Sequence, residues 1–202
     1  MKKAILLMIL LISSWIGFTQ TLENLDFISP VHDDMAAVER DGQWGFINAN
    51  GDLVIDFRND LVPSKNKAGN YPVFSDDRAL IKQKKEGIVY YGYIDSSGKT
   101  IIDPEYLNAT PFVEGEAIVL KLVKETLGSN DALGKNVINY KYFEVVIDVN
   151  NEVLDYLIPE GVNIVIDKDY MKAKPVITSK RVARKLYAVK GMHNSWNIVK
   201  LR

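Results

Sequence analysis

The stretch RDGQWGFINANGDLVIDF, residues 40 to 57, contains apolar segments separated by two glycine turns. The turns are Asp41-Gly42 and Asn50-Gly51, dipeptides that readily adopt the positive φ angles of tight hairpins. Together with the apolar residues on either side, they predict a three-stranded antiparallel meander. The strands are expected at residues 36–40, 43–48 and 53–57.

The same pattern recurs further along the chain. The second copy, FSDDRALIKQKKEGIVYYGYIDSSGKTIIDPEY, has turns at Glu86-Gly87 and Ser97-Gly98. The third begins FVEGEAIVLKLV and resumes, after the insertion KETLGSNDALGKNV, as INYKYFEVVIDVNNEVLDYLIP. A degenerate fourth copy reads KLYAVKGMHNSWNIVKLR.

A three-stranded sheet this small cannot bury its own face, so neighbouring units must share their cores. We therefore predict an all-β protein whose tandem three-stranded antiparallel meander repeats are stacked into one array, with an irregular C-terminal cap. Open stacking and closure into a ring are both compatible with the pattern. The single domain is expected over residues 20–202, with units at about 31–57, 74–106 and 112–159 and the cap at 160–202. Strands in the cap are expected at 163–167 and 176–178, with a closing hairpin formed by 188–189 and 196–201.

Two mid-strand glycines, Gly45 and Gly92, follow Trp44 and Tyr91 in the first two copies. Because side chains alternate along a strand, Trp44 and Phe46 should share one face and Gly45 the other. A glycine inside a strand weakens pairing, so it usually marks a close approach by another backbone or by a ring. An aromatic ring of the neighbouring unit could fill the space.

The combined pattern resembles the WG β-repeat family. The second copy carries most of it, as YGYIDSSGKTIIDPEY followed by PFVEGEAIV, and the first copy carries the Trp-Gly pair itself. The resemblance extends over residues 31–122, is weaker over 138–159, and departs where Phe143-Glu144 and Trp196-Asn197 stand in place of Trp-Gly. The structural repeat positions that it implies are Trp44, Gly45, Gly51, Tyr91, Gly92, Gly98, Pro104, Tyr106, Phe112, Gly115 and Trp196. The resemblance also implies a binding or scaffolding module of bacterial proteins, many of them exported, without a general catalytic residue set.

The first residues, MKKAILLMILLISSWIGFTQ, have the layout of a secretory signal peptide. Two lysines precede an apolar run over residues 4–12, and small or polar residues follow. The apolar stretch is too short to span a bilayer. We expect residues 1–19 to be removed and the mature protein to be periplasmic or secreted, with no membrane span.

Composition narrows the function classes. There are no cysteines, which excludes disulfides, thiolate catalysis and Cys-ligated zinc. The formal charge of −1 becomes −3 without residues 1–19, since these contain two lysines and no acids. Nucleic-acid binding is therefore not expected, and the basic stretch KRVARK at 180–185 is interpreted as a solvated strand or turn.

Candidate chemistry is sparse. His32 lies beside Asp33 and Asp34, but the equivalent position in the second copy is Ser75, so a solvated turn is favoured over a metal ligand. Acidic residues recur before each first strand, and turn formation is favoured over calcium binding, which stays open. No nucleophile elbow or phosphate loop is present. We therefore predict no catalytic residues, no cofactor and no resident metal.

Aromatic side chains cluster on the second strand of each unit. Trp44 and Tyr91 are expected in the repeat core. Tyr90, Tyr93 and Phe46 form a possible binding surface, on which sugars or peptide side chains could stack.

The sequence thus predicts an exported, non-catalytic β-repeat protein that binds a protein or a component of the cell envelope. Its ligand and oligomeric state are undetermined. Two alternatives remain: a carboxylate-dependent cell-envelope hydrolase, and a structural oligomer built by edge-to-edge strand pairing.

Overall fold

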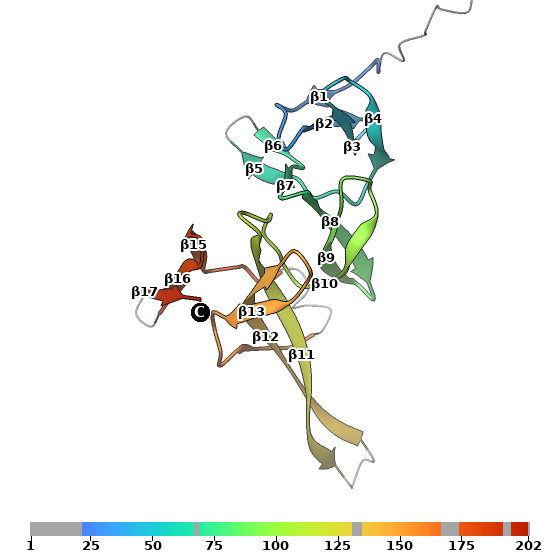
Figure 1. Ribbon diagram of the computed structural model, residues 1–202. Helices are drawn as coiled ribbons and strands as arrows, with labels where there is room; N and C mark the ends of the chain where they lie inside the picture. Colours follow the sequence, from blue (N-terminus) through green and yellow to red (C-terminus); the bar gives the residue numbers. More distant parts are fainter. Residues whose placement is uncertain (1–21, 67–68, 131–134, 167–173, 192–194, 202) are drawn as a thin grey trace, which may run out of the picture.

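The computed structural model describes residues 22–66, 69–130, 135–166, 174–191 and 195–201 (Figure 1). The regular secondary structure of these residues is entirely β, which confirms the predicted all-β class. Among them no helix is long and apolar enough to cross a membrane. The predicted signal peptide, residues 1–19, lies outside the described residues.

The described strands form small antiparallel sheets that follow one another along the chain. The first unit contains β1 (Phe27–Ile28), β2 (Met35–Arg40), β3 (Gln43–Asn48) and β4 (Leu53–Arg58). The second contains β7 (Phe74–Ser75), β8 (Arg78–Lys85), β9 (Ile88–Ile94) and β10 (Thr100–Tyr106). The third contains β11 (Glu116–Asn130), β12 (Lys135–Asp148), β13 (Val153–Tyr156) and β14 (Val162–Ile164), and the fourth β15 (Lys180–Ala183), β16 (Leu186–Lys190) and β17 (Trp196–Lys200). A separate hairpin pairs β5 (Ser64–Asn66) with β6 (Gly69–Tyr71).

The first three units contain the expected meander, whereas in the fourth β16 and β17 match β2 and β3 by register and β15 takes the place of β1. A short strand, β1 or β7, adds to the edge of the first two sheets. The insertion in the third copy extends β11 and β12 into a long hairpin. No strand forms at residues 176–178; β15 begins at Lys180 instead, and with β16 and β17 it builds a regular sheet within the segment predicted as an irregular cap. The β5–β6 hairpin was not predicted.

The hairpin turns use the residues that their backbone angles require. Asp41 and Gly42 have φ angles of 52° and 72°, as a two-residue hairpin turn demands. At the second turn of the first three units only the last residue has positive φ: Gly51 at 86°, Gly98 at 82° and Asn151 at 69°. Asparagine therefore replaces glycine in the third unit because it tolerates the left-handed region.

The mid-strand glycines make room for a bulge in the third strand of their own unit. A Cβ at Gly45 would lie 2.8 Å from the carbonyl oxygen of Ile55, and one at Gly92 would lie 2.7 Å from the nitrogen of Pro104. Between Tyr93 and Tyr91 the paired residue moves from Ile102 to Tyr106, so extra residues of β10 bulge over the glycine. The close approach predicted at these glycines is confirmed, and of the two alternatives it is backbone, not an aromatic ring of the neighbouring unit, that occupies the space.

The third unit shows what happens when this glycine is absent. By register, Val38 pairs with Gly45 and Ile81 with Gly92, whereas the equivalent Val119 pairs with Val145. The residues that stand for Trp-Gly are therefore Glu144-Val145, one residue later than the predicted Phe143-Glu144. Residues 145 and 146 pair with 156 and 155, without the bulge found over the glycines.

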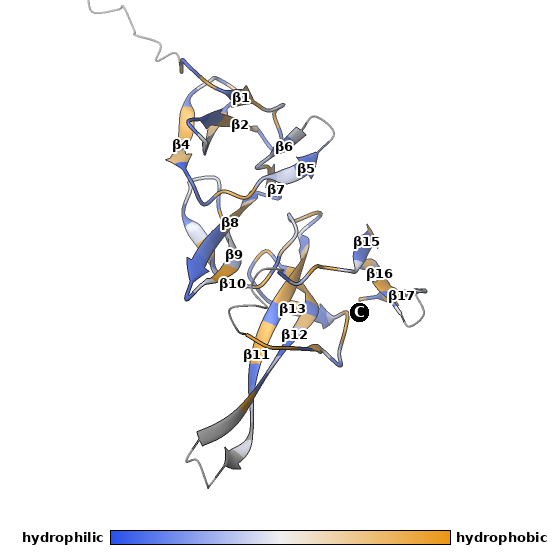
Figure 2. Ribbon diagram, turned by 180° about the vertical axis from the view of Figure 1, so that it is seen from behind, coloured by the Kyte–Doolittle hydropathy of each residue, from blue (hydrophilic) through white to orange (hydrophobic). Residues whose placement is uncertain are grey.

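Buried apolar clusters join consecutive units. The first cluster combines Trp44, Phe46 and Ile55 of the first unit with Phe74 and Ile81 of the second. A second cluster joins the second unit to the third, and another joins the third to the fourth. Figure 2 shows apolar segments on strands of all four units.

The sheets of the middle units are apolar on both faces, because alternate residues serve different clusters. On β8, Ala79 and Ile81 belong to the cluster shared with the first unit, while Leu80 belongs to the cluster shared with the third. On β9, Ile94 and Tyr93 divide in the same way. We call the face toward the following unit the forward face and the opposite one the backward face.

Replacing a mid-strand glycine should therefore be costly. Gly92→Ala should lower the free energy of unfolding by about 3 kcal/mol, since the new methyl overlaps backbone that cannot move independently. Gly51→Ala is the control: it has positive φ but open space around it, so it should cost about 1 kcal/mol. Urea titrations measure both values, and equal costs would contradict the role of the bulge.

The two tryptophans of the described residues offer a second comparison. Trp44 is 9% exposed and Trp196 is 43% exposed. Trp44→Ala should lower the free energy of unfolding by roughly 3 to 5 kcal/mol, because it removes a ring from the shared core. Trp196→Ala should cost less than about 1 kcal/mol. A loss below about 1 kcal/mol for Trp44→Ala would show that its ring does not stabilise the array.

Candidate functional site

The predicted aromatic binding surface does not exist as a continuous surface. Phe46 is 1% exposed and Tyr93 is 0% exposed, because both lie on forward faces covered by the next unit. Burial also raises the pKa of Tyr93 well above its usual value, with a further contribution from Tyr106. Only Tyr90, of the three predicted residues, is partly exposed, with the Lys85 ammonium 5.9 Å from its ring centroid.

The predicted repeat positions mostly lie in the interior. Trp44, Tyr91, Tyr106 and Phe112 are buried, and so is Pro104 at the bulge of β10. The glycines at positions 42, 51, 87, 98 and 115 have positive φ. Trp196 is the exception, because its ring is exposed. Its position nevertheless corresponds to that of Trp44: the next residue, Asn197, pairs with Val189 in the way that Gly45 pairs with Val38.

The acidic turns before each first strand connect the units to one another. Both residues of Asp33-Asp34, Asp76-Asp77 and Glu114-Gly115 have positive φ. The Asp33 carboxylate accepts a hydrogen bond from the Asp76 backbone N–H at 2.8 Å, and the Asp76 carboxylate accepts one from the Gly115 N–H at 2.7 Å. Arg181 of the fourth unit then donates to the Glu114 carboxylate at 2.6 Å. We call this succession the acidic ladder.

A second set of contacts connects the units at their other turns. Arg58 of the first unit donates to the Gly98 carbonyl at 3.2 Å and forms a two-point pair with Asp60. The Tyr106 hydroxyl of the second unit donates to the Asn151 side-chain oxygen at 2.5 Å. The second turns of the second and third units thus contact the third strand of the preceding unit.

Two buried carboxylates fasten the fourth unit to the third. Glu144, which stands in the place of Trp44, accepts hydrogen bonds from the backbone N–H groups of Thr178 and Ser179 and from the Thr178 hydroxyl. Glu116 accepts one from the Tyr187 hydroxyl at 2.7 Å. A buried carboxylate is stable only when hydrogen bonds or positive charges compensate its lost hydration, so these two define where the unit docks.

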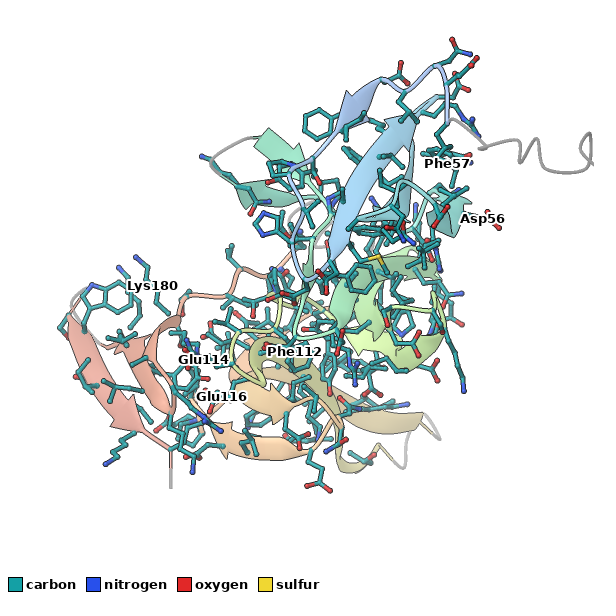
Figure 3. The ribbon with its side chains drawn as sticks, turned by 45° about the horizontal axis from the view of Figure 1, so that its top comes forward. Asp56, Phe57, Phe112, Glu114, Glu116 and Lys180 are labelled. Atoms are coloured by element: carbon teal, nitrogen blue, oxygen red, sulfur yellow. The ribbon has the colours of Figure 1, made fainter. Side chains whose placement is uncertain are left out.

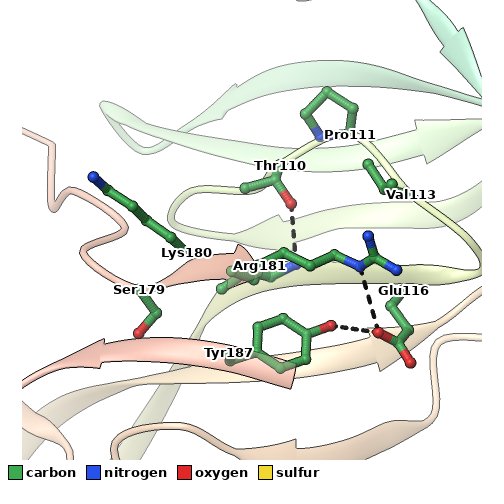
Figure 4. A pocket seen from close by; sticks show the side chains of 9 residues that line it. Thr110, Pro111, Val113, Glu116, Ser179, Lys180, Arg181 and Tyr187 are labelled. Atoms are coloured by element: carbon green, nitrogen blue, oxygen red, sulfur yellow. Dashed lines mark hydrogen bonds and ion pairs between the residues drawn. The ribbon is translucent and has the colours of Figure 1, made fainter. Parts of the chain in front are cut away.

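A pocket of about 150 Å³ lies at this junction (Figure 4). Figure 4 shows Arg181 and Tyr187 converging on Glu116, with the Arg181 Nε 3.6 Å from a carboxylate oxygen. The lining residues are Thr110, Pro111, Val113, Glu116, Ile118, Ser179, Lys180, Arg181 and Tyr187. Within the described residues, the buried Ser179 hydroxyl has no hydrogen-bond partner.

Two groups in this pocket, Tyr187 and Arg181, have a raised pKa and keep their protons. Burial, together with the hydrogen bond to Glu116, raises the pKa of Tyr187, so its phenol remains a donor. Burial lowers the pKa of Arg181, but the hydrogen bond and charge of Glu114 outweigh this effect and the pKa is raised. Among the described lining residues, no base lies within hydrogen-bond distance of Ser179. The arrangement therefore supports docking of the fourth unit and provides no activated nucleophile.

The residues considered for metal binding lie apart from one another or are already engaged. His32 is exposed in its turn, where its ring centroid lies 6.4 Å from that of Tyr71. Within the described part of the chain, no group of three or more His, Asp or Glu side chains is placed to hold a metal ion. The carboxylates of Asp33 and Asp76 accept backbone hydrogen bonds in the acidic ladder.

The forward face of the fourth sheet has an exposed surface that the sequence interpretation missed. It contains apolar side chains with high exposure, Ile198 at 63% and Val182 at 56%, beside Trp196. Three exposed lysines lie among them. We call this set the terminal face: Lys180, Val182, Lys190, Trp196, Ile198 and Lys200. Hydrophobic periodicity indicated the strands here, but the exposure of their forward face depends on what covers it.

Comparison with known families identifies the repeats. The WG containing repeat family matches at residues 44–58 and 91–121, which confirms the resemblance predicted from the sequence over these segments. No protein of curated function and no solved structure matches the chain. These two segments, in the first unit and across the second and third units, are thus similar to WG repeats, and register and packing relate the remaining units to them.

The acidic ladder can be tested at its middle step. Asp76→Ala should lower the free energy of unfolding by about 1 kcal/mol more than Asp77→Ala, because only the Asp76 carboxylate bonds to the next unit. Both residues have positive φ, near 55°, so the backbone cost of alanine cancels in the comparison. Chemical denaturation measures the difference, and equal losses would show that the ladder does not stabilise the array.

The docking of the fourth unit can be tested at Glu144. Glu144→Ala should destabilise the protein by about 3 kcal/mol, because it leaves buried donors without an acceptor. Limited proteolysis should then cut within residues 174–201 first. The exposed Glu152, on the same unit, is the control and should tolerate alanine. Unchanged protease resistance in Glu144→Ala would contradict this role.

Proposed function

We propose that this protein is an exported, non-catalytic binding module for a protein or a cell-envelope component. The terminal face carries the proposal. It is the forward face of a repeat unit, and the equivalent faces of the preceding units are covered by the next sheet. Exposed aromatic and aliphatic side chains gathered on one face mark interaction sites.

The N-terminal sequence supports export. Its two lysines, short apolar run and small residues before residue 20 are typical of a cleaved secretory signal. Periplasmic or secreted localisation follows from this proposal. Determining the N-terminal residue of the protein recovered from its own cells tests it directly.

The architecture supports binding over catalysis. The buried carboxylates Glu116 and Glu144 accept hydrogen bonds that dock the fourth unit, and Asp60 pairs with Arg58. These acids hold sheets together, whereas a hydrolase would direct a pair of carboxylates at a substrate.

Site-specific crosslinking in the native envelope fraction tests the proposal. A photoreactive residue at Ile198 should give a reproducible adduct, while one at Val54, exposed on the first sheet, should not. The matched positions are both exposed aliphatics on strands. The same adducts at both positions, or none at Ile198, would contradict binding at the terminal face. Hydrolysis of cell-wall fragments by the purified protein would contradict a non-catalytic role.

A further inference from the structure

The C-terminal end of the array has a charge opposite to that of the rest of the chain. Residues 171–202 contain nine lysines and arginines and no aspartate or glutamate. The remaining 170 residues hold the other 16 basic and all 26 acidic side chains, a net charge of −10. The near-zero charge of the whole chain conceals this asymmetry. A molecule of this kind orients its basic end toward a negative surface.

The terminal face combines this charge with apolar groups in one plane. Register places Lys190 beside Trp196 and Ala188 between Lys180 and Ile198. The ammonium groups of Lys180 and Lys190 lie 4.9 Å and 5.1 Å from the Trp196 ring centroid. In Figure 3 Lys180 lies at the opposite end of the molecule from Asp56 and Phe57. Two lysines thus lie over the exposed Trp196 ring, and Lys180 lies two strands across from Ile198 on the same face.

A second copy of the chain does not provide a suitable occupant. Head-to-tail stacking would bring the backward face of the first sheet onto the terminal face. On that backward face Ala36 and Val38 are already buried, at 3% and 0% exposure. The exposed apolar residues of the first sheet, Ile28 and Val54, lie on its outer strands β1 and β4, so the central strands β2 and β3 offer no exposed large apolar side chain to the terminal face.

We propose that the terminal face binds the surface of an anionic phospholipid bilayer. This inference rests on the proposed function and identifies the class of envelope component. Lysines near an anionic bilayer are attracted to its headgroups, and tryptophan favours the boundary between headgroups and acyl chains. Ile198 and Val182 reach the apolar side of that boundary while the lysine side chains extend to the phosphates.

The acidic remainder of the chain sets the orientation of the bound protein. Repulsion between its net negative charge and the bilayer keeps the preceding units away from the surface, so contact is confined to the fourth sheet. Since the attraction is electrostatic, binding should be reversible and should weaken as salt rises. An acidic protein partner would share the charge preference, but it would not require a lipid surface.

Vesicle co-sedimentation tests the inference, with the full chain in the form recovered from its own cells. Phosphatidylcholine vesicles containing phosphatidylglycerol should bind the protein at least about tenfold more tightly than pure phosphatidylcholine vesicles. The triple variant K180E/K190E/K200E should lose this preference. The control K65E/K82E/K84E makes the same charge change at three exposed lysines of the acidic part of the chain. It should keep the preference for vesicles that contain phosphatidylglycerol. Any N-terminal apolar segment that is retained contributes equally to all variants.

The apolar contribution is tested separately with Trp196→Ala and Ile198→Ser. Each should weaken vesicle binding by about threefold or more while circular dichroism shows an unchanged fold. Equal binding to both vesicle types, loss of binding in both triple variants alike, or sedimentation through self-association without lipid would overturn the inference. A specific protein adduct at Ile198 without vesicle binding would overturn it as well and leave the proposed binding function intact.

Discussion

The sheets in the middle of this protein are apolar on both faces, so each needs a neighbouring sheet on either side. Burial of apolar surface is the main favourable contribution to folding, and a three-stranded sheet cannot achieve it alone. Residues that alternate along β8 and β9 contribute to two different cores. The stability of one unit is therefore inseparable from that of the next, as in other repeat proteins. The same requirement makes the ends of the array distinctive.

Polar contacts add register to this apolar stacking. The acidic ladder joins the turns before the first strands of consecutive units, and a second set of contacts joins second turns to the preceding third strands. At the last junction a carboxylate, Glu144, takes the place of the core aromatic, and its hydrogen bonds align the fourth unit. Buried polar groups such as Glu144 have all their hydrogen bonds only when the two sheets are aligned in one way. They therefore define the alignment of neighbouring sheets more sharply than apolar packing alone.

The sequence predicted the strands and turns well because their signals are local. Asp41-Gly42 and Gly51 require particular backbone angles, and the structure has them. It predicted the exposure of aromatic residues poorly. Phe46 and Tyr93 are buried, whereas Trp196 is exposed, although Phe46 and Trp196 both lie on forward faces. Strand periodicity assigns a side chain to a face, but the sheet that covers the face comes from a distant part of the chain. The group that approaches Gly45 could not be identified from the sequence for a similar reason: it is a backbone bulge in β4, which only the strand register reveals.

Native-state hydrogen exchange of the backbone amides tests the shared-core account most directly. If adjacent sheets depend on one another, the amides of β8, β9, β11 and β12 should exchange last and with similar free energies of opening, since each of these strands contributes to cores on both sides. The amides of β1 and β17, at the two ends, should exchange earlier. Complete exchange of the second sheet while the first and third remain protected would show that the units are stable independently and would contradict the account.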